Sequence, residues 1–342
     1  MSRRRAQHLR QFEHLVFRAQ CPNGSQRRYL SDAMTQATAS NTLRIVHETR
    51  YHYASVVDTA QHVAHLQPPH TACQTLHQFD LAIEPAGAQV RLNTDAFGNH
   101  RTYFSLPSLH HSLSVKAQSV VTTRALNDAA SSMSWEEVRS FFGYKAGAPG
   151  SPAAGFVFSS HHAPVDEVFS QYARASFTPA RPLALAARDL MQRIYTDCTY
   201  ESHSTDIGTP AAQALAQRRG VCQDFAHILI ACLRSVGVAA RYVSGYLLTH
   251  PAEGQQRLIG ADASHAWVSV YLPDVAQQDH ASGGWLDLDP TNNQSGWASP
   301  GTDYVRLAIG RDFADVSPLR GVLLGGATHT LEVGVTVEPF DL

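Results

Sequence analysis

Apolar and polar residues alternate along four stretches in the first half of the chain, within residues 42–126. The stretches read LRIVHETRYHY, HQFDLAIEP, QVRLNTDAFGNHRTYFSL and SLSVKAQSVVTT, with Pro, Gly and Asn between them. Since neighbouring residues of a strand face opposite sides of a sheet, the alternation predicts antiparallel strands. We expect a small β-sandwich or barrel domain here. Residues 95–99 (DAFGN) are typical of a hairpin turn, with Gly98 or Asn99 at positive φ.

A helical period replaces the alternation further along the chain. Ser134 and Glu137 form a capping box that opens a short helix, and a Gly- and Pro-rich stretch follows. We therefore expect residues 127–178 to be a linker with a short helix. Beyond it, apolar residues recur on one helical stripe up to about Thr196. Residues 179–342 are expected to form a second domain.

The stretch GVCQDFAHILIACLRSVGVAARYVSGYL predicts a buried helix followed by a strand. Apolar residues recur every three or four positions from Cys222 until Gly237 ends the helix. The segments AARYVSGYLL, SHAWVSVYL and GWLDLDP then read as successive strands bounded by Gly, Pro and Asp. The second domain is therefore expected to be α+β, with the helix packed on the sheet that follows it.

Composition and charge exclude several classes of protein. The 342 residues are 44% hydrophobic and 16% charged, which is typical of a globular protein long enough for two domains. A net charge of −2 provides no strong field for nucleic acid or anionic lipid, so we expect no nucleic-acid and no membrane partner. No apolar run suits a membrane span, and the Arg-rich start lacks the apolar segment of a secretory signal. Residues 1–41 are interpreted as a disordered extension, or as the product of a start codon placed before the true one at Met34.

The five cysteines are irregularly spaced and include no CxxC pair. This pattern argues against a disulfide framework and a cysteine zinc site, and it favours a reducing, cytoplasmic location. The sequence also lacks HExxH, Walker A and GxGxxG motifs, so we expect no metal and no cofactor. Nothing in the sequence indicates an oligomeric state.

Cys222 occupies a position that suits a nucleophile, the first turn of a buried helix. Backbone N–H groups and the helix dipole at that end stabilise a thiolate and can receive a substrate oxyanion. His265 follows in a predicted strand as the candidate base, and Asp289 follows as the candidate orienter of its imidazole. Asp287 competes for the last role, because a period of two places both aspartates on one face. Each residue also has an ordinary structural interpretation: the cysteine as a core thiol, the histidine as one of many scattered histidines, and the aspartates as turn formers.

Four motifs surround these residues: GVCQDFAH, ARYVSGYL, DASHAWV and a GW followed by DPTNN. In this order they resemble the transglutaminase-like superfamily, in particular its bacterial branch of transglutaminase-like cysteine peptidases. The resemblance covers the chain from about residue 179, and the region 42–126 resembles the N-terminal β domain of that branch. It implies a papain-like, transglutaminase-like core. It also implies a catalytic triad with Cys222 as nucleophile, His265 as base and, of the two aspartates, Asp289 as third member.

The same resemblance implies an enzyme that transfers acyl groups from amide bonds through a thioester. We expect a hydrolase of the thiol protease type, whose partner is a peptide, isopeptide or small amide that water finally cleaves. The phenol of Tyr200 is a candidate oxyanion donor, with packing between helices as the alternative. Three other functions stay open: a cross-linking transglutaminase, a non-catalytic binding domain that keeps the fold, and a metal-binding or redox protein.

Overall fold

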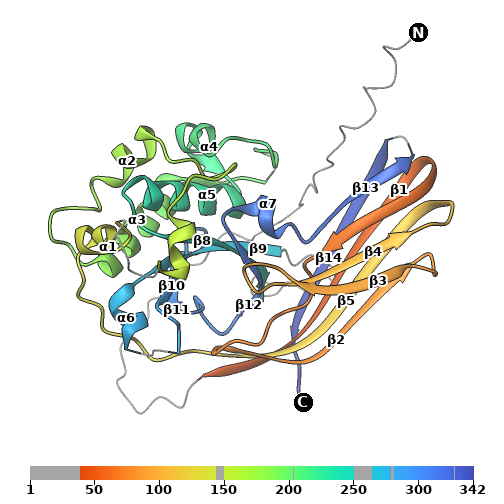
Figure 1. Ribbon diagram of the computed structural model, residues 1–342, viewed down its shortest axis with the longest axis horizontal. Helices are drawn as coiled ribbons and strands as arrows, with labels where there is room; N and C mark the ends of the chain where they lie inside the picture. The colour runs from red at the N-terminus through yellow and green to blue at the C-terminus, as the bar shows by residue number, and fades with distance from the viewer. Residues whose placement is uncertain (1–38, 144–149, 203, 250–263, 279–280, 327) are drawn as a thin grey trace, which may run out of the picture.

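A computed structural model describes residues 39–143, 150–202, 204–249, 264–278, 281–326 and 328–342. It shows an α+β protein in which a large curled β-sheet stands beside a smaller sheet covered by helices (Figure 1). The predicted fold class is confirmed, with the β-rich first domain in the form of a half-barrel. Most of the predicted N-terminal extension, up to residue 38, lies outside the described residues. Its last part, Ser40 and Asn41, opens the first strand.

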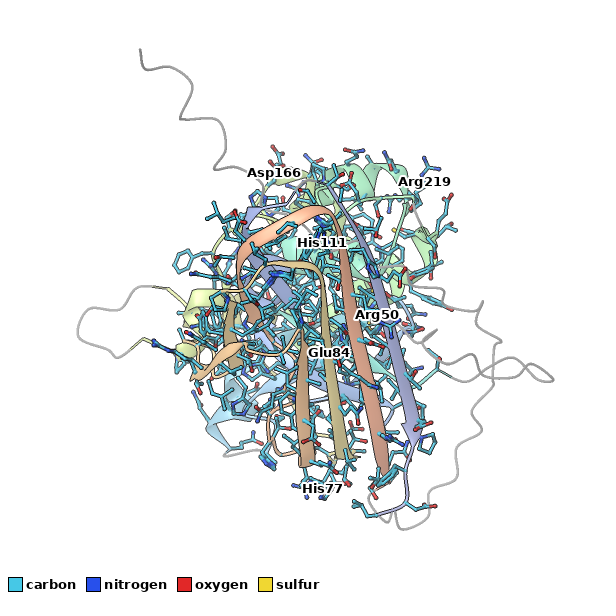
Figure 2. All side chains as sticks on the ribbon, turned by 90° about the vertical axis from the view of Figure 1, so that its right-hand side faces the viewer. Arg50, His77, Glu84, His111, Asp166 and Arg219 are labelled. Atoms are coloured by element: carbon cyan, nitrogen blue, oxygen red, sulfur yellow. The ribbon has the colours of Figure 1, made fainter. Side chains whose placement is uncertain are left out.

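The curled sheet is built on β1, a strand of 25 residues. Its strands are β1 (Ser40–Ala64), β2 (Gln74–Glu84), β3 (Gln89–Thr94), β4 (His100–Leu106), β5 (His110–Arg124), β13 (Leu319–Gly325) and β14 (His329–Pro339). Along β1, Leu43 and Ile45 are buried while Arg44 and Arg50 are exposed, as the alternation predicts. Figure 2 looks onto the outer side of this sheet, where Arg50, His77 and Glu84 are exposed.

The last two strands of the chain complete the curled sheet. β14 pairs with the first half of β1, from Leu43 with Pro339 to Tyr53 with His329, and β13 pairs with the second half. The range 179–342 predicted for the second domain therefore differs from the structure at its end, where residues 319–339 hydrogen-bond to the first strand. Pairing between opposite ends of a chain leaves no local signal in the sequence.

The second sheet holds five antiparallel strands in the order β11-β10-β9-β8-β12. Their bounds are β8 (Ala240–Leu247), β9 (Ser264–Tyr271), β10 (Trp285–Asp289), β11 (Gln294–Trp297) and β12 (Tyr304–Gly310). The long helix α5 (Cys222–Ser235) packs on β8 and β9, as its period predicts. Gly237 ends this helix at φ +87°, a conformation that glycine adopts without strain.

Further helices cover the outer side of α5 and the second sheet (Figure 1). They are α1 (Trp135–Phe141), α2 (Glu167–Ala173), α3 (Leu183–Asp197), α4 (Ala211–Gln217), α6 (Pro273–Gln277), α7 (Phe313–Val316) and the 3-10 helix η1 (Pro152–Phe156). The predicted capping box of Ser134 and Glu137 opens α1. The expected linker 127–178 also holds α2, which packs on α5 and is too short to show a clear helical period. Within the described ranges, every helix is too short or too polar to traverse a lipid bilayer.

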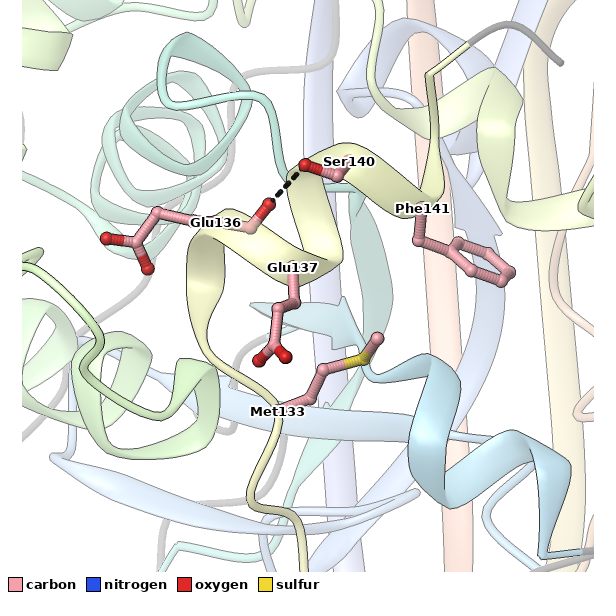
Figure 3. A pocket seen from close by; sticks show the side chains of 5 residues that line it. All are labelled: Met133, Glu136, Glu137, Ser140 and Phe141. Carbon is pink, nitrogen blue, oxygen red and sulfur yellow. Dashed lines mark hydrogen bonds between the residues drawn. The ribbon is translucent and has the colours of Figure 1, made fainter.

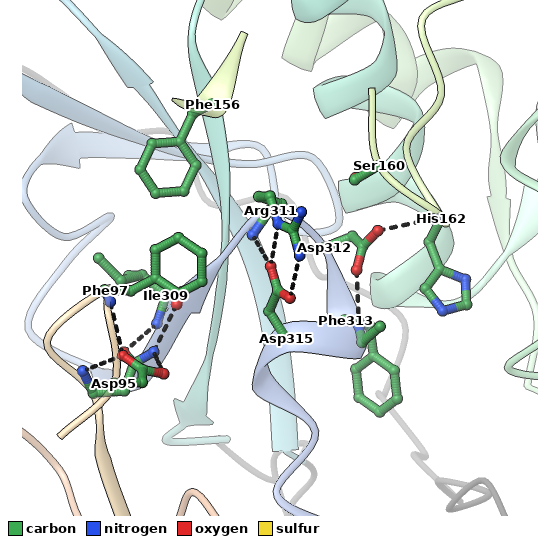
Figure 4. A network of polar contacts seen from close by, with 12 residues as sticks. Asp95, Phe97, Phe156, Ser160, His162, Ile309, Arg311, Asp312, Phe313 and Asp315 are labelled. Atoms are coloured by element: carbon green, nitrogen blue, oxygen red, sulfur yellow. Dashed lines mark hydrogen bonds and ion pairs between the residues drawn. The ribbon is translucent and has the colours of Figure 1, made fainter. Parts of the chain in front are cut away.

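Two side-chain amides join the curled sheet to the edge of the second sheet. Asn99 donates to the Ile309 carbonyl and accepts from the Ile309 N–H, both at 2.8 Å. Figure 4 shows Ile309 beside Asp95 and Phe97 of the same turn. Gln74 makes the same pair of bonds with the backbone of Arg306, at 3.0 and 2.8 Å. These amides occupy polar groups of β12 that an edge strand otherwise leaves to solvent. Gly98 has the positive φ expected of the turn, so residues 95–99 form the turn and also bind the two sheets together.

Three buried histidines predict that the fold loses stability in acid. Burial lowers the pKa of His47 to about 4, that of His62 to about 4 and that of His227 to about 3. In the unfolded chain these rings titrate near 6.5, so below that pH the unfolded state binds more protons. We expect the melting temperature to fall steadily as the pH drops from about 7 to about 4. The His62→Phe variant is expected to reduce this slope, and an unchanged melting temperature across the range would contradict the prediction.

Candidate active site

Cys222 is the first residue of α5 and is 8% exposed. Asp224 fixes the start of the helix, because its Oδ2 accepts hydrogen bonds from the Val221 N–H at 2.9 Å and the Thr205 hydroxyl at 2.6 Å. A Cβ at Gly220 would lie 2.7 Å from the same carboxylate oxygen, so glycine makes room for it. Cys222 therefore lies in a rigid first turn, at the positive end of the helix dipole.

His265, near the start of β9, lies between Cys222 and Asp289. Its Nε2 donates to Asp289 Oδ2 at 2.7 Å, and both side chains are buried. Desolvation opposes the charged ring, but the charge and hydrogen bond of Asp289, together with the neighbouring Cys222, raise the pKa of His265 well above its usual value. Because Nε2 is held by Asp289, Nδ1 is the ring nitrogen that remains for the thiol. The structure thus brings the three predicted residues together.

Asp289 is the most heavily hydrogen-bonded side chain of this group. Its Oδ1 accepts from the backbone N–H groups of Thr291 at 2.8 Å and Asn292 at 3.3 Å. Its Oδ2 accepts from His265, from Asn292 Nδ2 at 2.8 Å and from the Tyr304 hydroxyl at 2.7 Å. Burial opposes ionisation, yet the charge of His265 and these donors hold the pKa of Asp289 below its usual value. The carboxylate is therefore kept charged and fixed in orientation.

The other aspartate, Asp287, has a different partner. Its Oδ2 accepts a hydrogen bond from Trp267 Nε1 at 2.8 Å. The indole of Trp267 lies near the His265 ring, with centroids 6.2 Å apart and planes inclined by 28°. Gly245 lies opposite His265 on β8, and a Cβ there would come within 2.5 Å of the indole. Asp287 therefore orients Trp267, while Asp289 contacts the imidazole.

Tyr200 lies beside the start of α5. It belongs to β6 (Thr199–Tyr200), which pairs in parallel with β7 (Arg219–Gly220) and sets Tyr200 opposite Gly220. Its half-buried ring meets the ring of Phe225 edge-on, with centroids 6.4 Å apart. This contact agrees with the packing alternative, and the role of the phenol as an oxyanion donor stays a prediction.

Sequence reasoning missed Asn292 and Tyr304 as neighbours of Asp289. Asn292 lies inside the DPTNN motif, three residues after Asp289, and this short spacing could have predicted the contact. Tyr304 is the first residue of β12, where nothing in the local pattern distinguishes it from a core aromatic residue. Only the strand order of the sheet brings its hydroxyl to the carboxylate.

One hollow of the described residues lies away from the predicted site residues, on the first helix of the linker region. A hollow of about 400 Å³ on α1 is lined by Met133, Glu136, Glu137, Ser140 and Phe141 (Figure 3). In it the Ser140 hydroxyl donates to the Glu136 carbonyl, an ordinary contact between helical turns.

Among the described residues, no group of three or more His, Cys, Asp or Glu side chains is arranged to hold a metal ion. The described cysteines, Cys73, Cys198, Cys222 and Cys232, are free thiols.

Two protein families match the chain. Residues 43–122 match the family described as bacterial transglutaminase-like N-terminal region, and residues 170–290 match the transglutaminase-like superfamily. An uncharacterised protein of Mycobacterium tuberculosis is 38% identical over 310 residues, which cover 89% of this chain and 95% of that protein. A protein-glutamine gamma-glutamyltransferase of Pseudomonas aeruginosa is 32% identical over 121 residues, 33% of this chain and 16% of that enzyme. A solved structure from Cytophaga hutchinsonii, described as a candidate cysteine protease, superposes with a TM-score of 0.67 at 18% identity and covers 89% of this chain and 92% of its own.

Proposed function

The chain belongs to the transglutaminase-like superfamily, and from this premise we propose that it is a thiol hydrolase of amide bonds. The residues proposed to carry the chemistry are Cys222 as nucleophile, His265 as acid and base, and Asp289 as orienter. The observation that supports this assignment is the buried His265–Asp289 hydrogen bond beside the first turn of α5. A buried imidazole with a raised pKa is suited to remain protonated next to a thiolate.

The proposed first step forms a thioester. The Cys222 thiol first gives its proton to His265. The sulfur then attacks the amide carbonyl carbon, and the carbonyl oxygen becomes an oxyanion. Backbone N–H groups of the first turn of α5 are the proposed hydrogen-bond donors to that oxyanion, with the Tyr200 phenol as a further donor. The C–N bond then breaks, and the leaving amine takes the proton from His265 Nδ1.

The proposed second step releases the acyl group. Water gives a proton to His265 and attacks the thioester carbon, the C–S bond breaks, and Cys222 leaves as the thiolate beside a protonated ring. The product is a carboxylic acid. If a primary amine attacks in place of water, the product is a new amide and the enzyme is a transglutaminase. The similarity to the Pseudomonas aeruginosa gamma-glutamyltransferase favours keeping this second candidate.

The partner and location follow from the same proposal. We propose a peptide, isopeptide or small amide as the substrate, because the chemistry requires an amide carbonyl and an amine leaving group. A reducing compartment such as the cytoplasm would keep Cys222 in the reactive form. The four free thiols of the described residues agree with that location.

The test is a profiling experiment on the full chain and its Cys222→Ala variant. Peptide, isopeptide and small-amide libraries are incubated with each protein, with and without an added primary alkylamine, and all products are read by mass. We expect carboxylic acid products from the wild type alone. Amide products that dominate when the amine is present would favour the transglutaminase, and products that form equally with the variant would refute both.

A further inference from the structure

We propose that Tyr304 is a positioning residue that sets the basicity of His265 through Asp289. The inference rests on the proposed function, because it concerns the same three side chains. Its hydroxyl donates to Asp289 Oδ2 at 2.7 Å, the oxygen that also accepts from His265 at 2.7 Å. Asn292 Nδ2 is the third donor to this oxygen, at 2.8 Å, and donors that share one carboxylate oxygen compete for its negative charge. The phenol therefore controls how much of that charge His265 receives.

The ring of Tyr304 is held firmly in place. It is 6% exposed and meets the rings of His265 and Trp267 at centroid distances of 5.9 and 5.5 Å. Burial, followed by the charge and hydrogen bond of Asp289, raises the pKa of Tyr304 well above its usual value. The hydroxyl consequently keeps its proton and acts as a donor throughout the neutral range.

The curled sheet fixes the backbone that carries Tyr304. Asn41 Nδ2, at the start of β1, donates to Asp303 Oδ1 at 2.7 Å. Thr123, at the end of β5, donates its hydroxyl to the Thr302 carbonyl at 2.5 Å. Both contacts lie within two residues of Tyr304. The half-barrel thus holds the two residues that precede β12, and β12 begins with the tyrosine that hydrogen-bonds Asp289.

Among the described residues, the charged and titratable groups around His265 lie on or next to β9, β10, α5 and β12. β10 contributes Asp289, which contacts His265, and Asp287, which bonds Trp267. α5 contributes Cys222, and β12 contributes Tyr304, which Asp303 precedes. β8 sets only Gly245 directly opposite His265. Removal of the Tyr304 hydroxyl leaves Asp289 Oδ2 with fewer donors, so more of its charge acts on the imidazolium. The pH at which His265 loses its proton is then expected to rise.

The rate of alkylation by iodoacetate measures this change in the titration of His265, and it requires no substrate. The reagent is an anion, so a thiolate beside an imidazolium reacts with it faster than a thiolate beside a neutral ring. The rate of Cys222 alkylation, followed by peptide mass, is therefore expected to fall at alkaline pH as His265 deprotonates. In Tyr304→Phe the midpoint of that fall should move up by about half a pH unit or more, since a hydrogen bond to a charged group is lost.

Tyr246→Phe is the matched control. Tyr246 is as deeply buried as Tyr304, and its hydroxyl bonds His47 Nδ1 at 2.8 Å instead of Asp289. We expect a comparable loss of melting temperature in both variants and a shifted midpoint in Tyr304→Phe alone. A midpoint in Tyr304→Phe equal to that of the wild type would overturn the inference. A wild-type rate that shows no alkaline fall at all would instead refute the thiolate–imidazolium pair, and with it the proposed function.

Discussion

The Cys222→Ala variant is expected to lose amide cleavage by roughly ten-thousand-fold or more while it keeps its fold. The loss is large because alanine has no sulfur to form the thioester, and only oxyanion and binding effects remain. The fold persists because Cys222 is a small residue in the first turn of α5, where alanine is a good helix former. We expect a cost of at most about 1 kcal/mol in the free energy of unfolding. Turnover and circular dichroism, measured on the same samples, check both parts.

Cys232→Ala is the control for that variant. Cys232 lies on the same helix, is completely buried, and burial raises the pKa of its thiol. Its replacement removes a packed side chain and is expected to lower stability by about 1 to 2 kcal/mol, with little change in turnover. Turnover that survives in Cys222→Ala, or that disappears in Cys232→Ala without unfolding, would show that the nucleophile was assigned incorrectly.

Asp289→Asn is expected to lower turnover by about a thousand-fold or more. The amide has nearly the same shape, but it presents no negative charge to His265, and its NH₂ group can face Nε2 and favour the other tautomer. The pKa of His265 should fall strongly as well. In the wild type, protonated His265 stabilises the fold below its usual pKa, and this contribution is lost as the pH rises through the raised value. Histidine NMR titration of both proteins measures the shift directly.

Asp287→Asn separates the two aspartates. Asp287 bonds Trp267 and lies in the same strand, so its replacement disturbs a similar volume. Burial raises the pKa of Asp287, so a neutral amide is better tolerated there than at Asp289. We expect a His265 titration close to that of the wild type and at most about a ten-fold loss of turnover. Equal effects of the two variants on the His265 titration would contradict the assignment.

The local pattern was sufficient for the elements that carry the candidate site. A period of three to four residues predicted a helix that begins at Cys222, and the alternation in SHAWVSVYL predicted the strand of His265. The same alternation placed Asp287 and Asp289 on one face but left their roles open. The structure separates them by their partners, because Asp287 hydrogen-bonds Trp267 and Asp289 hydrogen-bonds His265.

What the pattern could not supply are contacts between distant segments. β14 completes the sheet of β1, and Tyr304 reaches Asp289 from a strand that is not its hydrogen-bonded neighbour. Such contacts depend on strand order, for which neither period nor composition carries information. Asn99 is a similar case. The residue types at 95–99 were sufficient to predict a turn, but they carried no information on the hydrogen bonds between Asn99 and Ile309.

The central proposal is that Cys222 is the nucleophile and that it acts beside the protonated ring of His265. The most direct measurement is the rate of alkylation of each cysteine by iodoacetamide at pH 7, followed by peptide mass. We expect Cys222 to react at least about a hundred times faster than the buried Cys73 and Cys232. Slow labelling of Cys222, at the rate of those buried thiols, would contradict the account.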